Sequence, residues 1–138
     1  MLPGAVIGAT FAPGFTEDLS SWRLVIDDEG NLFQDIKVST HENQWQGEQR
    51  QEYFFIGQDK VIQLLLTAEE VGFMSYKDSY DISVTDQALH VLSIRFGECE
   101  KTVTAYGAAW LAYEGDADMK GFLELWKAVH QYAPFPAK

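Results

Sequence analysis

The chain has 138 residues, of which 46% are hydrophobic and 22% charged, and its formal net charge is −11. This length predicts one domain with a core of its own. The acidic balance argues against nucleic acid and anionic membranes as partners, since both attract clustered Lys and Arg. No run of the sequence approaches the ~20 apolar residues of a membrane span.

The cellular compartment has few markers in this sequence. Cys99 is the only cysteine, so an internal disulfide and a cysteine-rich zinc site are both excluded. The opening residues have neither a basic start nor a continuous apolar segment, and they are a poor match to a signal peptide. We therefore expect the cytoplasm by default, with a periplasmic or secreted location if a leader has been removed.

Residues 1–20 are rich in Gly, Ala and Pro. Glycine and proline interrupt regular structure. We expect this stretch to be an extended arm attached to the single domain that spans residues 1–138.

A hairpin is expected next. Trp22, Leu24 and Ile26 alternate with polar residues, as on one face of a strand. Residues 27–31 have turn chemistry, and residues 32–40 return as the second strand. Residues 41–51 are polar and contain Trp45, and they predict a long loop or a splayed strand end. We expect residues 52–56 to add a short third strand.

Residues 58–71 show the clearest helical pattern. Apolar side chains recur at helical spacing at Val61, Leu64, Leu65 and Ala68. Gly72 follows as a left-handed cap, and Phe73 is expected to pack back on the last turn.

The second half repeats the order of strands and helix. Residues 88–96 alternate as a strand, Gly97 and Glu98 turn the chain, and residues 101–106 return it. Residues 107–115 predict a short turn of helix. A final helix is expected over 116–132, with acidic residues at its positive end.

This order predicts an α+β fold. We expect an antiparallel sheet of four to five strands, with two amphipathic helices on one face and the other face left for solvent or a partner.

The segments "LLLTAEEVGFMSYKDSY", "TDQALHVLSI" and "EKTVTAY" carry a resemblance. They resemble a family of small bacterial α+β domains of ββαββα type whose function is uncharacterised, and the layout is loosely similar to emfourin-type metalloprotease inhibitors. The resemblance covers about residues 53–130. It implies the fold, and it transfers no functional residue to this chain.

No motif in the sequence indicates a catalytic or metal site. Residues 116–127 open like a calcium loop, but Lys120 and Lys127 replace two of the ligands that such a loop needs. Cys99 lies roughly 30 Å along the hairpin from His90, too far for a nucleophile and its base. We expect no catalytic residue, no metal site and no cofactor.

The preferred function is a non-catalytic binding or accessory domain that meets a protein partner through the open sheet face or the Trp45 loop, with self-association as a further possibility. Trp45, Tyr76 and Tyr80 are the candidate partner-binding residues. An indole in a polar loop is costly to expose unless it packs or recognises something. The alternative is a small hydrolase-like enzyme that uses acidic residues in the range 78–86, namely Asp78, Asp81 and Asp86.

Overall fold

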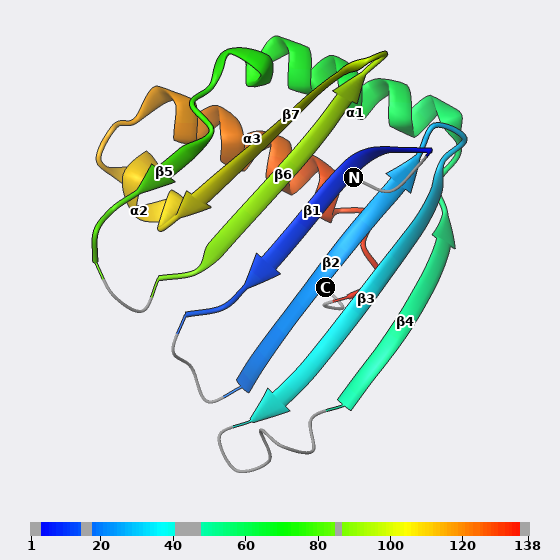
Figure 1. Ribbon diagram of the computed structural model, residues 1–138, viewed down its shortest axis with the longest axis horizontal. Helices are drawn as coiled ribbons and strands as arrows, with labels where there is room; N and C mark the ends of the chain where they lie inside the picture. Colours follow the sequence, from blue (N-terminus) through cyan, green and yellow to red (C-terminus); the bar gives the residue numbers. More distant parts are fainter. Residues whose placement is uncertain (1–3, 15–17, 41–47, 85–86, 136–138) are drawn as a thin grey trace.

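A computed structural model describes residues 4–14, 18–40, 48–84 and 87–135. The fold is α+β, with one mixed sheet of seven strands in the order β4-β3-β2-β1-β6-β7-β5 (Figure 1). The strands are β1 (Ala5–Ala12), β2 (Asp18–Asp27), β3 (Asn31–Thr40), β4 (Glu48–Phe55), β5 (Ser79–Asp81), β6 (Leu89–Phe96) and β7 (Cys99–Tyr106). The helices are α1 (Gln58–Glu70), α2 (Ala108–Tyr113) and α3 (Ala117–His130), with a 3-10 turn, η2 (Phe73–Ser75), after α1.

The prediction of four to five antiparallel strands and two helices gave too few strands and helices, and it missed a parallel pair. The sheet has seven strands, and β5 pairs with β7 in parallel. A third helix, α2, forms where a short helical turn was expected. Both expected hairpins are present, as β2–β3 and β6–β7.

The largest difference concerns the stretch expected to be an arm. Residues 5–12 form β1, which lies in the middle of the sheet between β2 and β6. Buried Ala5, Ile7 and Ala9 face the core. Pairing with β2 and β6 makes this segment a strand, although its Gly, Ala and Pro residues resemble a linker when only local sequence is considered.

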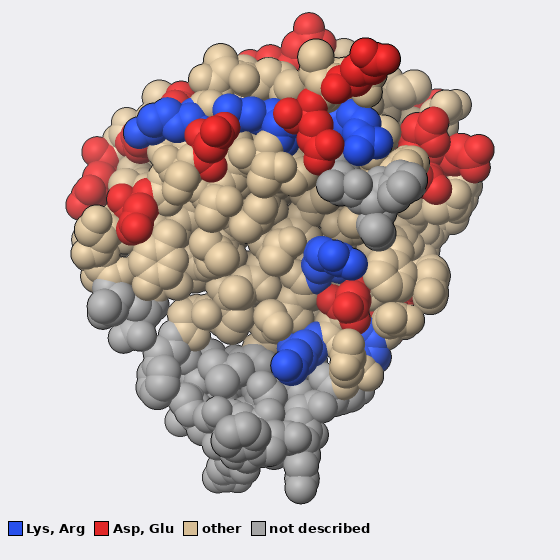
Figure 2. All heavy atoms as spheres, viewed as in Figure 1, with Lys and Arg blue, Asp and Glu red and all other residues tan. Residues whose placement is uncertain are grey.

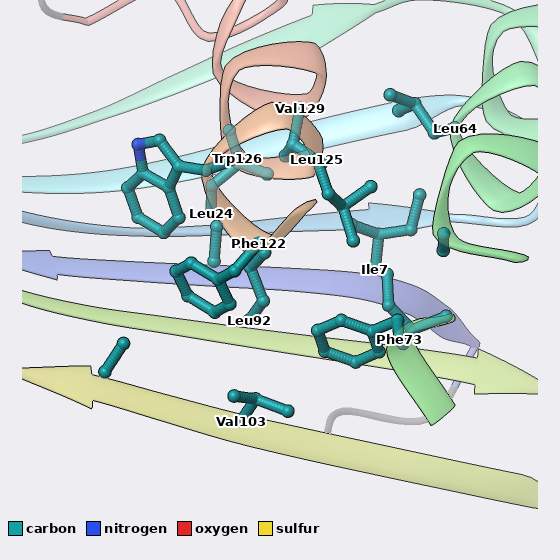
Figure 3. Packing of buried hydrophobic residues seen from close by; sticks show 14 of the residues in the cluster. Ile7, Leu24, Leu64, Phe73, Leu92, Val103, Phe122, Leu125, Trp126 and Val129 are labelled. Atoms are coloured by element: carbon teal, nitrogen blue, oxygen red, sulfur yellow. The ribbon is translucent and has the colours of Figure 1, made fainter. Parts of the chain in front are cut away.

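Helices α1 and α3 lie behind the sheet in Figure 1, so the opposite face is turned toward the reader. We call it the open face. Figure 3 shows how the sheet and the helices meet in the core, with Leu24 and Leu92 from the sheet pointing toward Phe122 and Trp126 of α3. All four side chains are buried. Burial of a Leu or Phe side chain stabilises a fold by about 1.5–3 kcal/mol, so this layer is the main source of stability.

Helix ends follow the local chemistry that the sequence predicts. The Asp116 carboxylate accepts a hydrogen bond from the Met119 backbone N–H at 3.0 Å and caps α3. Gly72 has a φ of 75°, in the left-handed region, and Phe73 after it is fully buried. This turn directs the chain away from α1 and toward β5.

The segment after α3 is fixed to the sheet by one buried amide. Gln34 on β3 donates from Nε2 to the Phe135 carbonyl at 2.7 Å, and its Oε1 accepts from the Phe135 N–H at 2.9 Å. Both polar ends of this fully buried side chain are therefore satisfied. The Arg50 guanidinium of β4 lies 5.0 Å from the centre of the Phe135 ring.

Candidate functional site

Tyr76 and Tyr80, two of the predicted partner-binding residues, lie in the core, with 5% and 4% of their surface exposed. The Tyr76 hydroxyl donates to the Val71 carbonyl at 2.9 Å. The Tyr80 hydroxyl donates to the Asp118 carboxylate at 2.7 Å and accepts from the Lys77 N–H at 3.0 Å. The first bond attaches the segment after η2 to the end of α1, and the second attaches β5 to the start of α3. Burial leaves little of either ring for a partner to contact.

Burial is the main cause that raises the pKa of Tyr76 to about 12, with the negative charge of Asp118 as the next cause. Burial also raises the pKa of Tyr80 to about 12, followed by its hydrogen bond to Asp118. Both phenols therefore stay protonated at neutral pH. They act as hydrogen-bond donors, and a role in partner binding stays a prediction.

The acidic residues of the hydrolase alternative have separate partners. Asp78 is 86% exposed and forms an ion pair with Lys101 at 2.7 Å. Asp81 accepts a hydrogen bond from the Ser83 backbone N–H at 2.6 Å. Asp86 and Trp45 lie outside the described residues. The hydrolase alternative stays a prediction.

His90 lies in an aromatic cluster between the sheet and α3. The centre of its ring lies 4.6 Å from the ring centre of Trp126 and 5.2 Å from that of Phe11, and both contacts are edge to face. Its Nδ1 is buried and has no hydrogen-bond partner among the described residues. Burial, followed by the nearby charge of His130, lowers the pKa of His90 from 6.5 to about 4.

The lowered pKa of His90 predicts acid sensitivity. Between pH 6.5 and about 4 the unfolded chain binds a proton at His90 that the folded chain does not, so stability present above pH 6.5 is lost as the pH falls through this range. We expect a loss of about 2 kcal/mol from this group by pH 4.5, less than the full shift implies because solvent reaches part of the ring. Urea unfolding of wild type and His90→Phe at pH 7 and pH 4.5 measures it. An equal pH-dependent loss in both proteins would contradict this account.

The open face has a depression along β1. Strand alternation turns Gly8, Thr10 and Ala12 toward this face, because Ile7 and Ala9, which alternate with them, are buried in the core. Gly8 lies between Val25 on β2 and Ser93 on β6. Thr10 lies in the same way between Arg23 and Val91. Gly8, which has no side chain, is thus flanked by Val25 and Ser93, and we call the depression along β1 the β1 trough.

Two hollows occupy the trough and the sheet beside it. One has a volume of about 100 Å³ and includes Gly8 and Val91 in its lining. The other has a volume of about 280 Å³ and extends from Thr10 across β2 to Asp35 and Lys37 on β3. In Figure 2 much of this face is uncharged, charged side chains follow its upper margin, and a small group of both signs lies right of centre.

Asp35 supplies an unused acceptor beside the larger hollow. Its Oδ1 is buried and has no hydrogen-bond partner within the described part of the chain. Asp35 lies opposite Arg23 on β2 and Gln51 on β4 in the strand registers. A buried polar atom left unpaired costs about 1–3 kcal/mol, which makes this position a candidate contact for a donor on a partner.

Sequence reasoning missed a second exposed feature, on β4. Tyr53, Phe54 and Phe55 are 73%, 55% and 65% exposed at the free edge of the sheet. The available signal was the aromatic run itself, because consecutive strand residues point to opposite faces and cannot all enter one core.

A larger hollow, of about 550 Å³, lies elsewhere. It is lined by residues of α1, η2 and the β6–β7 hairpin, including Phe73, Met74, Phe96 and the exposed Cys99. Neither Tyr76 nor Tyr80 lines it.

Residues 4–14, 18–40, 48–84 and 87–135 contain no group of three His, Cys, Asp or Glu side chains that could hold a metal ion. No helix in these ranges combines the length and apolar character needed to cross a bilayer.

No protein-family model matches the chain and no curated protein does either, so the resemblance to small bacterial ββαββα-type domains and to emfourin-type inhibitors stays a prediction.

Proposed function

We propose that this chain is a non-catalytic protein-binding domain whose open sheet face receives an extended segment of a partner protein. The observation that carries the proposal is the β1 trough, where Gly8 and Thr10 lie between side chains of β2 and β6 and line a hollow. None of the described helices covers this face. A sheet face with a depression parallel to its strands suits an extended backbone better than a small, enclosed ligand.

The chemistry of the trough indicates what such a segment would carry. The smaller hollow is lined mainly by uncharged side chains such as Val25 and Val91, which favour an apolar side chain of the partner. The larger hollow places the unpaired Asp35 oxygen near the exposed cations Arg23 and Lys37. A donor such as a backbone N–H of the partner would satisfy that oxygen.

Filling the trough tests the proposal. Peptides are selected from a displayed random library against the wild-type domain, and their affinities are measured by titration calorimetry. Thr10→Tyr places a large ring in both hollows, and we expect it to weaken binding at least about tenfold. Thr102→Tyr is the control, because Thr102 is exposed on the same face at β7 and lines neither hollow, although its hydroxyl lies at hydrogen-bond distance, 2.8 Å, from the Ser93 hydroxyl beside the trough.

Binding lost in Thr10→Tyr and kept in Thr102→Tyr supports the open face as the site. Equal affinity in both variants contradicts it. Selection that enriches no peptide above a blank support also counts against the proposal. Circular dichroism of each variant confirms that a lost signal reflects the surface and not unfolding.

Asp35→Leu is expected to make the domain more stable and to weaken its binding of the peptide. Removal of a buried oxygen without a partner should raise the free energy of unfolding by about 1 kcal/mol. The same change should weaken peptide binding, because the acceptor beside the larger hollow is gone. Urea unfolding and titration of the selected peptide measure the two effects. A variant that is less stable than wild type, or that binds equally well, would show that Asp35 does not have this role.

A further inference from the structure

The two edges of the sheet differ in length. β5 has three residues, whereas β4 has eight, and all eight pair with β3 on the inner side. β4 contains no proline or glycine. Natural proteins commonly shorten, bend or cover edge strands to prevent edge pairing. β4 is long and regular, so its outer side can accept another strand.

The backbone groups on that outer side can be assigned from the register. Ile56 donates its N–H to the Gly30 carbonyl at 2.8 Å, and the β3–β4 register continues from this pair. In an antiparallel ladder, residues alternate between pointing both backbone groups at one neighbour and pointing both away. Gln49, Gln51 and Tyr53 therefore direct their N–H and C=O groups toward the free edge.

The side chains near the middle of β4 carry opposite charges two residues apart. Arg50 and Glu52 share one face of the strand, and their side chains lie 3.9 Å apart. A strand with this arrangement is complementary to an antiparallel copy of itself when the twofold axis passes through the residue between the two charges. That residue is Gln51, whose backbone groups point outward.

We propose that β4 pairs with β4 of a second copy of this chain, in an antiparallel register centred on Gln51. Arg50 of each copy then lies opposite Glu52 of the other. If the twofold axis passed through Glu52 instead, the two Glu52 carboxylates would face each other and repel. If it passed through Tyr53, the paired segment would shrink from residues 48–54 to residues 51–55. The dimer joins two seven-stranded sheets with both open faces on the same side. This inference does not depend on the proposed peptide binding.

A charge-swap series tests the register. Sedimentation equilibrium of the full chain should give a mass near twice 15.6 kDa. Arg50→Glu places two Glu–Glu contacts across the axis and Glu52→Arg places two Arg–Arg contacts, so each should raise the dimer dissociation constant at least about tenfold. The double variant Arg50→Glu/Glu52→Arg restores opposite charges and should recover the dimer. A monomer at all concentrations, or single variants that dimerise like wild type, would overturn the proposal.

A symmetric cross-link provides an independent measurement. In the proposed register the two Gln51 residues face each other at a Cα separation of about 5.5 Å, which a disulfide can span. Gln51→Cys in a Cys99→Ser background should give a covalent dimer on mild oxidation. Gln49→Cys in the same background is the matched control, because its two copies lie about 13 Å apart along the strand. Equal cross-linking at both positions, or at position 49 alone, would refute the register.

Discussion

Replacing Gly30 with alanine is expected to lower the free energy of unfolding by about 3 kcal/mol. Gly30 lies in the β2–β3 turn with a φ of +97°, a conformation that side chains rarely adopt. A Cβ built there would collide with the backbone N, C and O atoms of Gly57, at the junction between β4 and α1. Backbone atoms cannot rotate out of the way, so the turn and the junction would have to separate.

Gly97→Ala is the matched control for that measurement. Gly97 also has a positive φ, +60°, in the β6–β7 turn, but no described atom lies within 4 Å of a Cβ at that position. Its expected loss is about 1 kcal/mol, from backbone conformation alone. Urea unfolding of the two variants measures the difference. Equal losses would show that the contact between Gly30 and Gly57 does not constrain the fold.

Phe122→Ala is expected to have the largest effect on stability, a loss of about 4 kcal/mol. Phe122 on α3 is fully buried, and its ring stacks on Trp126 at 6.4 Å between centres. Figure 3 shows it between the helix and the central strands of the sheet, where removal of the ring leaves a cavity that the packed neighbours cannot fill.

Ile62→Ala provides the comparison for Phe122→Ala. Ile62 lies on α1 and is half exposed, so its truncation should cost less than about 1 kcal/mol. Thermal and urea unfolding report both values. If Phe122→Ala lost no more stability than Ile62→Ala, the core would not be organised around the contact between α3 and the sheet.

Local periodicity accounts for the elements that sequence analysis predicted. The spacing of Val61, Leu64 and Ala68 marks α1, and all three are buried. The alternation of Trp22, Leu24 and Ile26 marks β2 in the same way. In these segments one face meets the core along the whole element, so a few neighbouring residues are sufficient to reveal the structure.

The missed strands depend on partners far away in the chain. β5 has three residues, and it is a strand because Ser79 and Tyr80 lie beside Thr104 and Ala105 of β7. β1 is a strand because β2 and β6 enclose it. Short or small-residue segments have no periodicity of their own, so their state is decided by tertiary pairing.

The same reasoning applies to the candidate site. The β1 trough exists because the registers place Gly8 between Val25 and Ser93, which are distant in sequence. Tyr80, a predicted partner-binding residue, lies in the core and donates its hydroxyl hydrogen bond to Asp118 at the start of α3. Neither arrangement can be predicted without the long-range pairing of strands and helices.

The most direct measurement of the central claim is a map of amide chemical shifts in the ¹⁵N-labelled domain during titration with the selected peptide. The account predicts shifts that concentrate at Gly8, Thr10 and their strand partners Arg23, Val25 and Val91. Shifts confined to α1 and α3, or a spectrum that does not change at saturating peptide, would contradict binding at the open face.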